Sequence, residues 1–494
     1  MTTPNRQTPD ARRPTSQVDK ALSHFDTHRT TVIDALKNLA RIPSVSFAGY
    51  DPANVKRSAE ATAAWLREAG LTTVEIWDLP GTHPCVFAEW KHPEAAATEI
   101  PTVLLYAHHD VQPPLREELW TSPPFEPTER DGRLYGRGTA DDKAGIAVHA
   151  ASLAAWLKTT GSLPVNVKVL IEGEEEIGSP HLADYLARYK ERLACDYMVL
   201  TDLSNYDVGK PSLTTSLRGL VTMDVTVAAL KSPLHSGMWG GPLPDPVAGL
   251  CKMLATLSDA QGRVAVAGLR EQVVPPTLDE RADFRALSMT EEIFREQAGV
   301  LDGVKLHGAP EDYLEKIWRE PSFSINAVEA GLRKSAGNVL LDAAWARIGL
   351  RLAPGMDPEA CTRLVVDHLK AVCPWGLKLD IVPEQGAKPW KTRPDHPVFE
   401  VAKKSLTAGY GSEAVCIGCG GTIPFVDMFT AVLGDVPALL VGIEDPYTNA
   451  HSENESLHLG DFDKAVRSQI RFLADLGEWA GVGAIHELPL QSSP

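Results

Sequence analysis

The stretch VNVKVLIEGEEEIGSP, residues 165–180, is the most informative part of this 494-residue sequence. Its first half, Val165–Ile171, is an apolar run of the kind found in buried β-strands. Three successive glutamates follow almost at once, and Gly178 then closes a turn. A buried strand should not end in clustered negative charge unless a cation neutralises it. The stretch therefore predicts a metal-binding edge of a sheet.

On both sides of this stretch, apolar strand-like runs alternate with runs of helical periodicity. Strands are expected at Thr73–Trp77, Cys85–Trp90, Thr102–Tyr106 and Asp196–Thr201, and helices at Val18–Ala40, Glu60–Glu68, Gly145–Leu157 and His181–Tyr189. This alternation predicts an α/β sheet with helices on both faces.

The pattern changes near Pro211. Leu220–Ala229 alternates as a half-exposed strand does, and several later runs predict more antiparallel strands with two helices on one side. The α/β pattern returns past Pro389. We therefore expect a discontinuous metal-binding domain of residues 18–212 and 389–494, an inserted α+β domain of residues 213–388, and a disordered lead of residues 1–17.

Composition narrows the classes of partner. The formal net charge of −17 argues against nucleic acid and anionic membrane surfaces, because both attract basic proteins. Seven cysteines are too few, and odd in number, for a disulfide framework. The N-terminus has no apolar segment of a secretory signal, and no stretch reaches the length of a membrane span. We expect a reduced, cytoplasmic protein.

Several metal-binding side chains stand beside expected turns or strand ends. His108 follows an apolar run, and Asp110 could hold the other ring nitrogen of that histidine. Asp141 and Asp142 follow a glycine-containing turn and lead into a helix. An N-cap role would explain one of these two aspartates, whereas a carboxylate between two cations could bridge them.

Glu175 and Glu176 are adjacent, so in an extended chain they would face opposite ways. One could bind metal while the other serves as general base. Asp202 also follows an expected strand, and His451 lies in a polar loop. Taken singly, each of these residues has an ordinary alternative role as a turn, cap or loop residue.

The set as a whole predicts a dinuclear site. One workable pairing gives the first cation His108, Asp202 and Asp141, and the second Glu176, His451 and Asp141; sequence spacing alone leaves other pairings open. Three protein ligands and an open position are typical of catalytic zinc. Nitrogen and oxygen ligands without thiolate favour two Zn²⁺ ions, with Mn²⁺ or Co²⁺ as alternatives.

Four motifs carry a resemblance to a known family: HHDVQP from His108, GRGTADDK from Gly136, EEEIGS from Glu174, and AHS from Ala450. Their order and spacing resemble the carnosinase/aminoacylase family of two-zinc metallopeptidases, in its cytosolic dipeptidase branch. The resemblance implies a mixed-sheet catalytic domain with an inserted lid that also makes homodimers. It implies Asp141 as bridge, Glu175 as general base, Glu176 as ligand, and a cis bond between Asp141 and Asp142.

The resemblance also implies residues for substrate recognition in and near the lid. His235 looks like the lid histidine that reaches the partner subunit's site and polarises the scissile carbonyl. Arg351 looks like the arginine that binds a substrate carboxylate, a task that suits bidentate pairing. Asn338, His396 and Thr422 look like further substrate contacts.

Two departures lie near the substrate end. The dipeptidase branch usually carries Arg-Glu before Gly-Gly-Ser/Thr-Ile-Pro, where this chain has Gly418 and Cys419. Glu453 also replaces a more usual Gln or Pro after the His-Ser pair. Both changes put the choice of substrate in doubt and leave the hydrolytic chemistry intact.

We therefore predict a dinuclear zinc hydrolase that cleaves the amide bond of dipeptides or similar small substrates with a free carboxylate. An N-acyl amino acid deacylase or a carbamoyl-type amidohydrolase is the alternative with the same metals. A non-catalytic binding protein on this fold is the alternative of another class, although mere binding does not need the base Glu175.

Overall fold

The computed structural model describes residues 16–94, 100–331, 333–392, 394–434 and 436–486. The chain divides into two compact units. Unit 1 contains the described residues up to Leu213, residues 394–415 and those from Phe429 onward; unit 2 contains residues 214–393 and 416–428. Unit 2 thus lies in sequence between segments of unit 1. The sequence analysis assigned residues 416–428 to the metal-binding domain, whereas in the structure they belong to unit 2.

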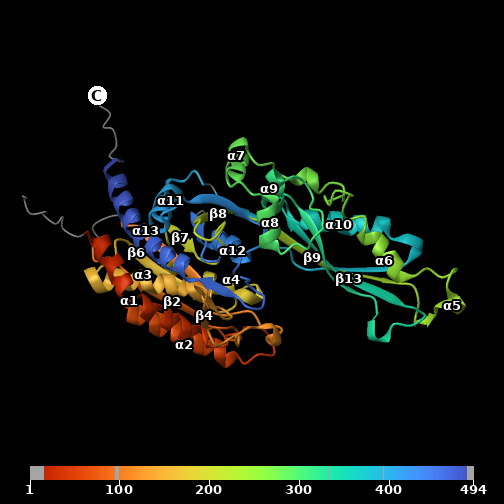
Figure 1. Ribbon diagram of the computed structural model, residues 1–494, viewed down its shortest axis with the longest axis horizontal. Coiled ribbons are helices and arrows are strands. Elements are labelled where there is room, and N and C mark those ends of the chain that lie inside the picture. The colour runs from red at the N-terminus through yellow and green to blue at the C-terminus, as the bar shows by residue number, and fades with distance from the viewer. Residues whose placement is uncertain (1–15, 95–99, 332, 393, 435, 487–494) are drawn as a thin grey trace, which may run out of the picture. The chain divides into compact units, whose positions relative to one another are not determined.

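Unit 1 is built on a mixed β-sheet with the strand order β1-β2-β6-β3-β7-β17 (Figure 1). The bounds of these strands are β1 Thr73–Trp77, β2 Cys85–Trp90, β3 Thr102–His108, β6 Asn166–Glu172, β7 Tyr197–Leu200 and β17 Ala438–Val441. The last four strands run parallel, while β2 is antiparallel to β6 and β1 to β2. The predicted α/β class with a mixed sheet is confirmed.

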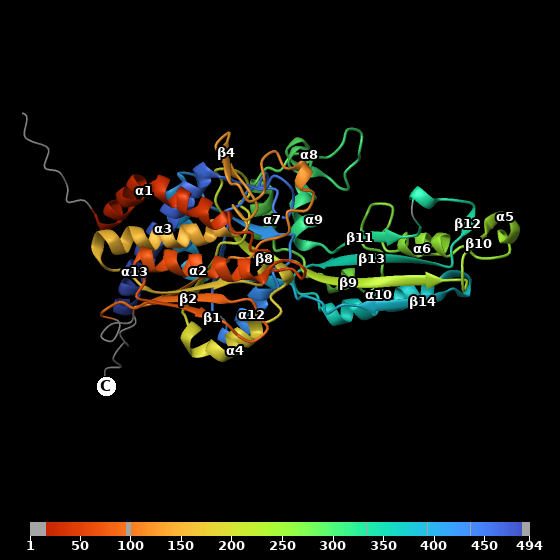
Figure 2. The same cartoon turned by 90° about the horizontal axis from the view of Figure 1, so that it is seen from below.

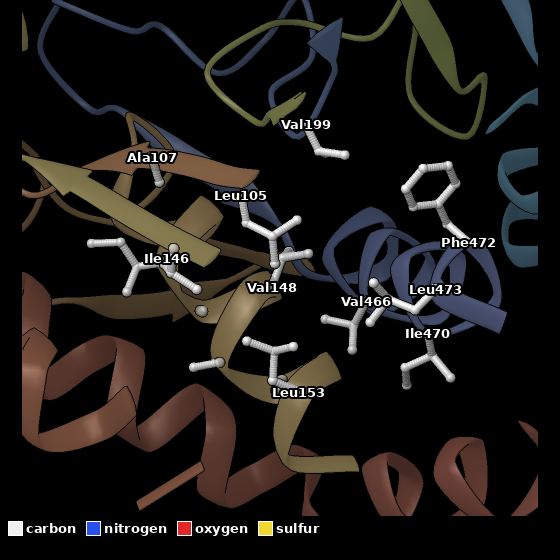
Figure 3. Packing of buried hydrophobic residues seen from close by; sticks show 14 of the residues in the cluster. Leu105, Ala107, Ile146, Val148, Leu153, Val199, Val466, Ile470, Phe472 and Leu473 are labelled. Carbon is white, nitrogen blue, oxygen red and sulfur yellow. The ribbon is translucent and has the colours of Figure 1, made fainter. Parts of the chain in front are cut away.

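Helices cover both faces of this sheet. Alternate residues of β3 and β6 point to one face of the sheet and pack against a group of long helices (Figure 3). Because the other face is covered as well, these strands are almost continuously apolar. These helices are α1 Gln17–Ala40, α2 Pro52–Ala69, α3 Lys143–Thr160, α11 Pro397–Tyr410 and α13 Leu459–His486. On the other face, α4 Leu182–Leu193 stacks Tyr189 on Trp77 with ring centroids 3.7 Å apart.

The helix ends follow local capping rules. Ser16 and Asp19 form a capping box at the start of α1, so the helix begins at Gln17, the last residue of the lead that was predicted to be disordered; residues 1–15 of that lead lie outside the described residues. Gly70 ends α2 with φ of 112°, a left-handed conformation that glycine adopts at low cost. The predicted helix Glu60–Glu68 is the second half of this longer helix, which starts at Pro52.

Unit 2 contains an antiparallel sheet of order β11-β13-β9-β14, whose strands lie side by side in that order in Figure 2. The bounds are β9 Gly219–Ala228, β11 Ser322–Glu329, β13 Ala343–Leu352 and β14 Lys378–Pro383. Alternate residues of β9 and β13 pack against α6 Pro246–Leu254 and α10 Pro358–Val372. The predicted arrangement of antiparallel strands with two helices on one side is present.

Residues 258–320 of unit 2 contain three short helices. They are α7 Leu278–Ala286, α8 Glu291–Ala298 and α9 Tyr313–Arg319. Other short elements in the chain are β4 Thr128–Arg130, β5 Arg133–Tyr135, β8 Ser212–Leu217, β10 Leu234–His235, α5 Ser236–Trp239, β12 Val339–Leu340, β15 Trp390–Lys391, β16 Val415–Cys419, α12 Pro424–Leu433 and β18 Ser456–His458. No helix within the described ranges is both long enough and apolar enough to span a membrane.

Candidate metal centre

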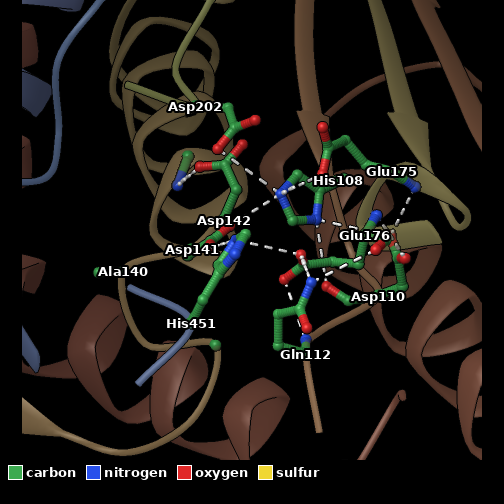
Figure 4. Close-up of polar contacts among 12 residues, drawn as sticks. His108, Asp110, Gln112, Ala140, Asp141, Asp142, Glu175, Glu176, Asp202 and His451 are labelled. Carbon is green, nitrogen blue, oxygen red and sulfur yellow. Dashed lines mark hydrogen bonds and ion pairs between the residues drawn. The ribbon is translucent and has the colours of Figure 1, made fainter. Parts of the chain in front are cut away.

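Metal-binding side chains of unit 1 gather at the carboxyl ends of its parallel strands (Figure 4). His108 is the last residue of β3, and Glu175 and Glu176 lie just beyond β6. Asp202 follows β7, and His451 lies in the loop between β17 and β18. Parallel strands bring residues that are distant in sequence to one edge of a sheet, where ligands commonly bind.

Asp141 lies between the two histidines of the cluster. Its Oδ1 is 3.0 Å from Nε2 of His108, and its Oδ2 is 3.0 Å from Nε2 of His451. Each carboxylate oxygen thus faces a different imidazole. This is the arrangement that a bridging carboxylate requires. The dinuclear prediction depends on the two histidines lying close enough to share such a carboxylate, and they do.

A further carboxylate lies near each histidine. Oδ1 of Asp202 is 3.7 Å from Nε2 of His108, and Oε2 of Glu176 is 3.3 Å from Nε2 of His451. Oε2 of Glu175 is 3.9 Å from Nε2 of His108. The structure therefore brings together the residues of the predicted pairing, with Asp202 at the His108 end and Glu176 at the His451 end.

Asp110 supports the His108 end of this cluster. Its Oδ1 is 3.5 Å from Nδ1 of His108, and it accepts backbone hydrogen bonds from Glu175 and Glu176 at 3.2 and 3.1 Å. Ser46 donates to its other oxygen at 2.7 Å. Asp110 thus orients His108, whose Nδ1 lies 3.1 Å from the Asp110 backbone carbonyl, and its carboxylate fixes the segment that carries two glutamates, as a supporting residue of a metal site does.

The conformation of the glutamate segment differs from the expectation of an extended chain. Glu175–Ile177 is one turn of 3₁₀ helix, which Gly178 ends in a left-handed conformation. The turn forms because the Glu175 and Glu176 amides point at Asp110, a partner that the local sequence does not reveal. The two side chains still separate, since Glu175 approaches His108 and Glu176 approaches His451.

Gln112 is a supporting residue that the sequence analysis quoted in a motif but gave no role. Its backbone N–H donates to Oε1 of Glu176 at 2.9 Å, and its side-chain amide donates to Oε2 at 2.8 Å. Both oxygens of Glu176 are therefore oriented by one residue. A glutamine that follows a predicted histidine ligand so closely was the signal available in the sequence.

The two adjacent aspartates have separate roles. The bond between Asp141 and Asp142 is cis, as the resemblance implied. Asp142 is the N-cap of α3 and accepts a hydrogen bond from the backbone of Gly145 at 3.1 Å. The capping interpretation therefore holds for Asp142, and Asp141, which faces the histidines, stays the candidate bridge.

Glu455, to which no role was assigned, ties the Asp141 loop to the His451 loop. Its carboxylate accepts hydrogen bonds from the guanidinium of Arg137 at 2.6 Å and from the backbone of Gly138, Ala140 and Asp141 at 2.9, 3.0 and 3.2 Å. Both charged side chains are buried. One residue thus fixes the loops that carry two of the predicted ligands.

Replacing Glu455 by glutamine should lower the free energy of unfolding by about 3–5 kcal/mol, because it leaves the buried Arg137 charge without a partner. It should also weaken metal binding, since the Asp141 loop loses its anchor. Denaturant titration and metal titration measure the two effects. The control is Glu453→Gln, whose partner Arg116 is mostly exposed; equal behaviour of the two variants would contradict the role of Glu455.

The electrostatics of the cluster fit bound cations. Burial, followed by the charges of Asp202 and Asp141 respectively, raises the pKa of Glu175 and of Glu176 well above the usual range. Burial lowers the pKa of His108, but the carboxylates of Asp110, Asp141 and Asp202 outweigh it and raise the pKa. In the described part of the chain, no lysine or arginine forms an ion pair with these carboxylates. Divalent ions would supply the missing positive charge, and oxygen and imidazole donors suit them.

A further carboxylate, Glu444, lies near the cluster and was not predicted. One of its oxygens lies within 4.8 Å of ligand atoms of Asp141 and Asp202, and Ser204 donates to its Oε2 at 3.2 Å. Burial, followed by the charge of Asp141, raises its pKa well above the usual range. The sequence signal was the acid that follows β17, the same strand-end position that identified Asp202.

Unit 2 holds four of the other predicted site residues. His235 is exposed at the N-cap of α5, and its strand β10 pairs with β12 so that Asn338 is close by: the Asn338 carbonyl accepts from Ser236 at 2.9 Å. Arg351 donates to Oγ1 of Thr422 at 2.6 Å. The structure thus brings these residues together in two pairs.

Two histidines of unit 1 lie apart from the cluster. His396 is the N-cap of α11, and its ring lies 6.0 Å from that of Tyr197 at the start of β7, the strand end opposite to the one that leads to Asp202. It therefore does not join the metal ligands. Nε2 of His109 donates to the carbonyl of Pro84 at 2.8 Å, away from the His108 cluster.

Comparisons with known proteins agree with this geometry. Residues 104–475 match the profile of Peptidase family M20/M25/M40. A cysteinylglycine-S-conjugate dipeptidase from Corynebacterium striatum is 31% identical over 383 residues, covering 77% of this chain and 82% of the relative. The family match, residues 104–475, spans the segments that carry the clustered residues.

Two solved structures are similar over nearly the whole chain. Human carnosine dipeptidase 1 superimposes with a TM-score of 0.83 at 28% identity and covers 94% of this chain and 100% of its own. The di-peptidase Dug1p from Saccharomyces cerevisiae superimposes with a TM-score of 0.81 at 26% identity, covering 93% and 98%. These proteins therefore share the fold of this chain.

Proposed function

Because this chain belongs to peptidase family M20/M25/M40, a family of metallopeptidases, we propose that it is a dinuclear zinc dipeptidase. Its substrates are dipeptides or similar small amides with a free carboxylate. The observation that carries this proposal is Asp141, whose two oxygens each lie 3.0 Å from a different histidine. The dipeptidase names of the relatives support the class of substrate.

In this proposal Asp141, His108 and Asp202 would hold one cation, and Asp141, Glu176 and His451 would hold the other. Bound divalent ions supply Lewis acidity that activates water and polarises a carbonyl oxygen. The ligand set contains imidazole and carboxylate without thiolate, which suits Zn²⁺ and also admits Mn²⁺ or Co²⁺.

Glu175 moves the proton. Its carboxylate lies beside His108 but makes none of the contacts that hold Glu176, so it is free to accept a proton from the attacking water and to deliver it to the leaving amine. Asp110 fixes its backbone at 3.2 Å, which keeps the carboxylate in position between the two transfers.

Unit 2 supplies substrate recognition in this proposal. Arg351 binds the free carboxylate of the substrate, with Thr422 as its neighbour. His235 reaches the site of the partner subunit and polarises the scissile carbonyl of the substrate bound there. Asn338, which adjoins His235 through the β10–β12 pair, also contacts this substrate. His396, at the N-cap of α11, is retained only as a secondary substrate contact.

We also propose that the chain forms a homodimer through unit 2. The edge strand β11 is exposed along most of its length and carries Ile325 and Val328 at 44% and 54% exposure. An unpaired apolar edge invites pairing with another chain. That the enzyme is cytoplasmic remains a prediction from the sequence.

Hydrolysis of a dipeptide panel by the zinc-loaded chain, with and without a chelator, tests the proposal. Dipeptides should be cleaved, chelation should abolish cleavage, and added Zn²⁺ should restore it, because the site has no other source of Lewis acidity. N-acetyl and N-carbamoyl amino acids run alongside. Cleavage of these compounds in preference to dipeptides would identify a deacylase or amidohydrolase, and metal binding without any cleavage would identify a binding protein.

A further inference from the structure

Two arginines of unit 2 hold the same short segment, Cys419–Thr422. Arg218 lies between β8 and β9, and Arg351 lies near the end of β13. The register of the sheet pairs Gly219 with Leu352 and Leu220 with Arg351, so both arginines occupy the same end of adjacent strands. Arg218 forms a hydrogen bond with Gly420 of this segment, and Arg351 forms one with Thr422.

All of the acceptors that these arginines contact are neutral. Arg218 donates from Nε to the carbonyl of Gly420 at 3.0 Å and from Nη1 to Oγ of Ser322 at 3.0 Å and the carbonyl of Glu320 at 3.4 Å. Arg351 donates from Nη1 to Oγ1 of Thr422 at 2.6 Å. Within the described ranges, neither guanidinium forms an ion pair with a carboxylate.

Arg347 shows what an arginine of this sheet does when carboxylates are at hand. It stands on the same strand as Arg351 and binds Asp224 at 3.1 Å and Glu384 at 2.5 Å. Arg218 and Arg351 therefore lack carboxylate partners because the fold places none beside them in the described residues, although it places two beside Arg347.

The two unpartnered charges lie close enough to repel one another. Burial, followed by the charge of Arg351, lowers the pKa of Arg218 to about 10, and burial lowers that of Arg351. Half-buried like charges without a counter-ion are unfavourable, so the site is incomplete until an anion binds. The Cys419 side chain acts electrostatically on both guanidinium groups. A thiol at this position offers no carboxylate to either arginine.

We propose that Arg218 and Arg351 form a two-carboxylate site that selects dipeptides with aspartate or glutamate as the C-terminal residue. Arg351 binds the main-chain carboxylate, and Arg218 binds the side-chain carboxylate of the same residue, each through charge-assisted hydrogen bonds. The inference rests on the proposed dipeptidase function and specifies its substrate. In addition to Arg351, it assigns Arg218 and the Cys419 position as determinants of specificity.

The kinetic test compares Ala-Glu with its neutral isostere Ala-Gln on the zinc-loaded chain. The wild type should favour Ala-Glu in kcat/KM by roughly ten- to a hundredfold, the range of a hydrogen bond to a charged group. In Arg218→Gln the ratio should fall towards one. The matched control Arg347→Gln, which changes an arginine that already has carboxylate partners, should keep the wild-type ratio.

Cys419→Glu provides a second variant that keeps both arginines. Its carboxylate should pair with them and remove the preference for Ala-Glu. A binding experiment is independent of turnover: glutarate should bind the metal-free wild type more tightly than glutaramate in calorimetry, and Cys419→Glu should lose this difference.

The outcomes separate the two proposals. A wild type that hydrolyses Ala-Glu and Ala-Gln equally well overturns the two-carboxylate site while leaving the dipeptidase function intact. Absence of hydrolysis of any dipeptide overturns the function, and glutarate binding then still reports on the arginine pair. Loss of the preference in Arg347→Gln to the same extent as in Arg218→Gln would also overturn the assignment.

Discussion

Replacing Glu175 by glutamine should lower kcat for dipeptide hydrolysis by about 10²–10⁴-fold, the usual contribution of a general base. The amide keeps the size and hydrogen-bonding reach of the side chain but cannot accept the proton of the attacking water. Metal content should stay at the wild-type level, because Asp141 and Glu176 make the close contacts with the two histidines. Steady-state kinetics and elemental analysis of the same sample measure both quantities.

Glu174 is the natural control for this variant. It is adjacent to Glu175 but turns away from the cluster, accepting hydrogen bonds from the backbone of His83 and facing Nδ1 of His181, both at 2.8 Å. Glu174→Gln should therefore keep most of the turnover. Activity retained in Glu175→Gln, or lost equally in both variants, would contradict the role of Glu175 as general base.

Replacing Asp141 by asparagine should have the largest effect on metal binding. An asparagine offers one neutral oxygen, so it cannot present a charged oxygen to a cation on either side. Changes to mere supporting residues already cost ~10–100-fold in metal affinity, and loss of the bridge should cost more than that. Competition with a chromophoric chelator measures the affinity, and activity should disappear with the metal.

Asp142→Asn is the control, because asparagine caps a helix about as well as aspartate does. Asp142 accepts from Gly145 at the start of α3 and does not face the histidines. Its variant should keep normal metal affinity. If instead Asp142→Asn loses metal and Asp141→Asn keeps it, the assignment of the two aspartates is reversed.

Most of the metal centre could be predicted from the sequence because its residues stand at the ends of strands with strong local signals. The strands Thr73–Trp77 and Cys85–Trp90 occur at their predicted bounds, since each is a short apolar run with clear flanking turns. Once the strands are placed, parallel pairing alone brings His108, Asp202 and the glutamates to one edge.

The residues that the sequence did not reveal depend on long-range contacts. Glu455 acts on the Asp141 loop, and Gln112 acts on Glu176; neither partner is near in sequence. The same holds for the 3₁₀ turn at Glu175, which depends on Asp110. Periodicity reports the local chain, and it carries no information about such partners.

The substrate side was harder to predict for a related reason. His396 resembles a substrate contact by motif, yet the helix that it caps places it beside Tyr197. Arg218 carries no distinguishing motif of its own and becomes informative only through the neutral partners that the fold gives it. Charge without a counter-charge is visible in a structure and invisible in a sequence.

Anomalous diffraction from crystals of the zinc-loaded protein tests the central claim most directly. The account predicts two zinc peaks about 3.5–4 Å apart, the spacing of two-metal sites. One peak should contact His108 and Asp202, the other Glu176 and His451, and each should contact a different oxygen of Asp141. A single peak, or two peaks that leave Asp141 outside the coordination of either ion, would contradict it.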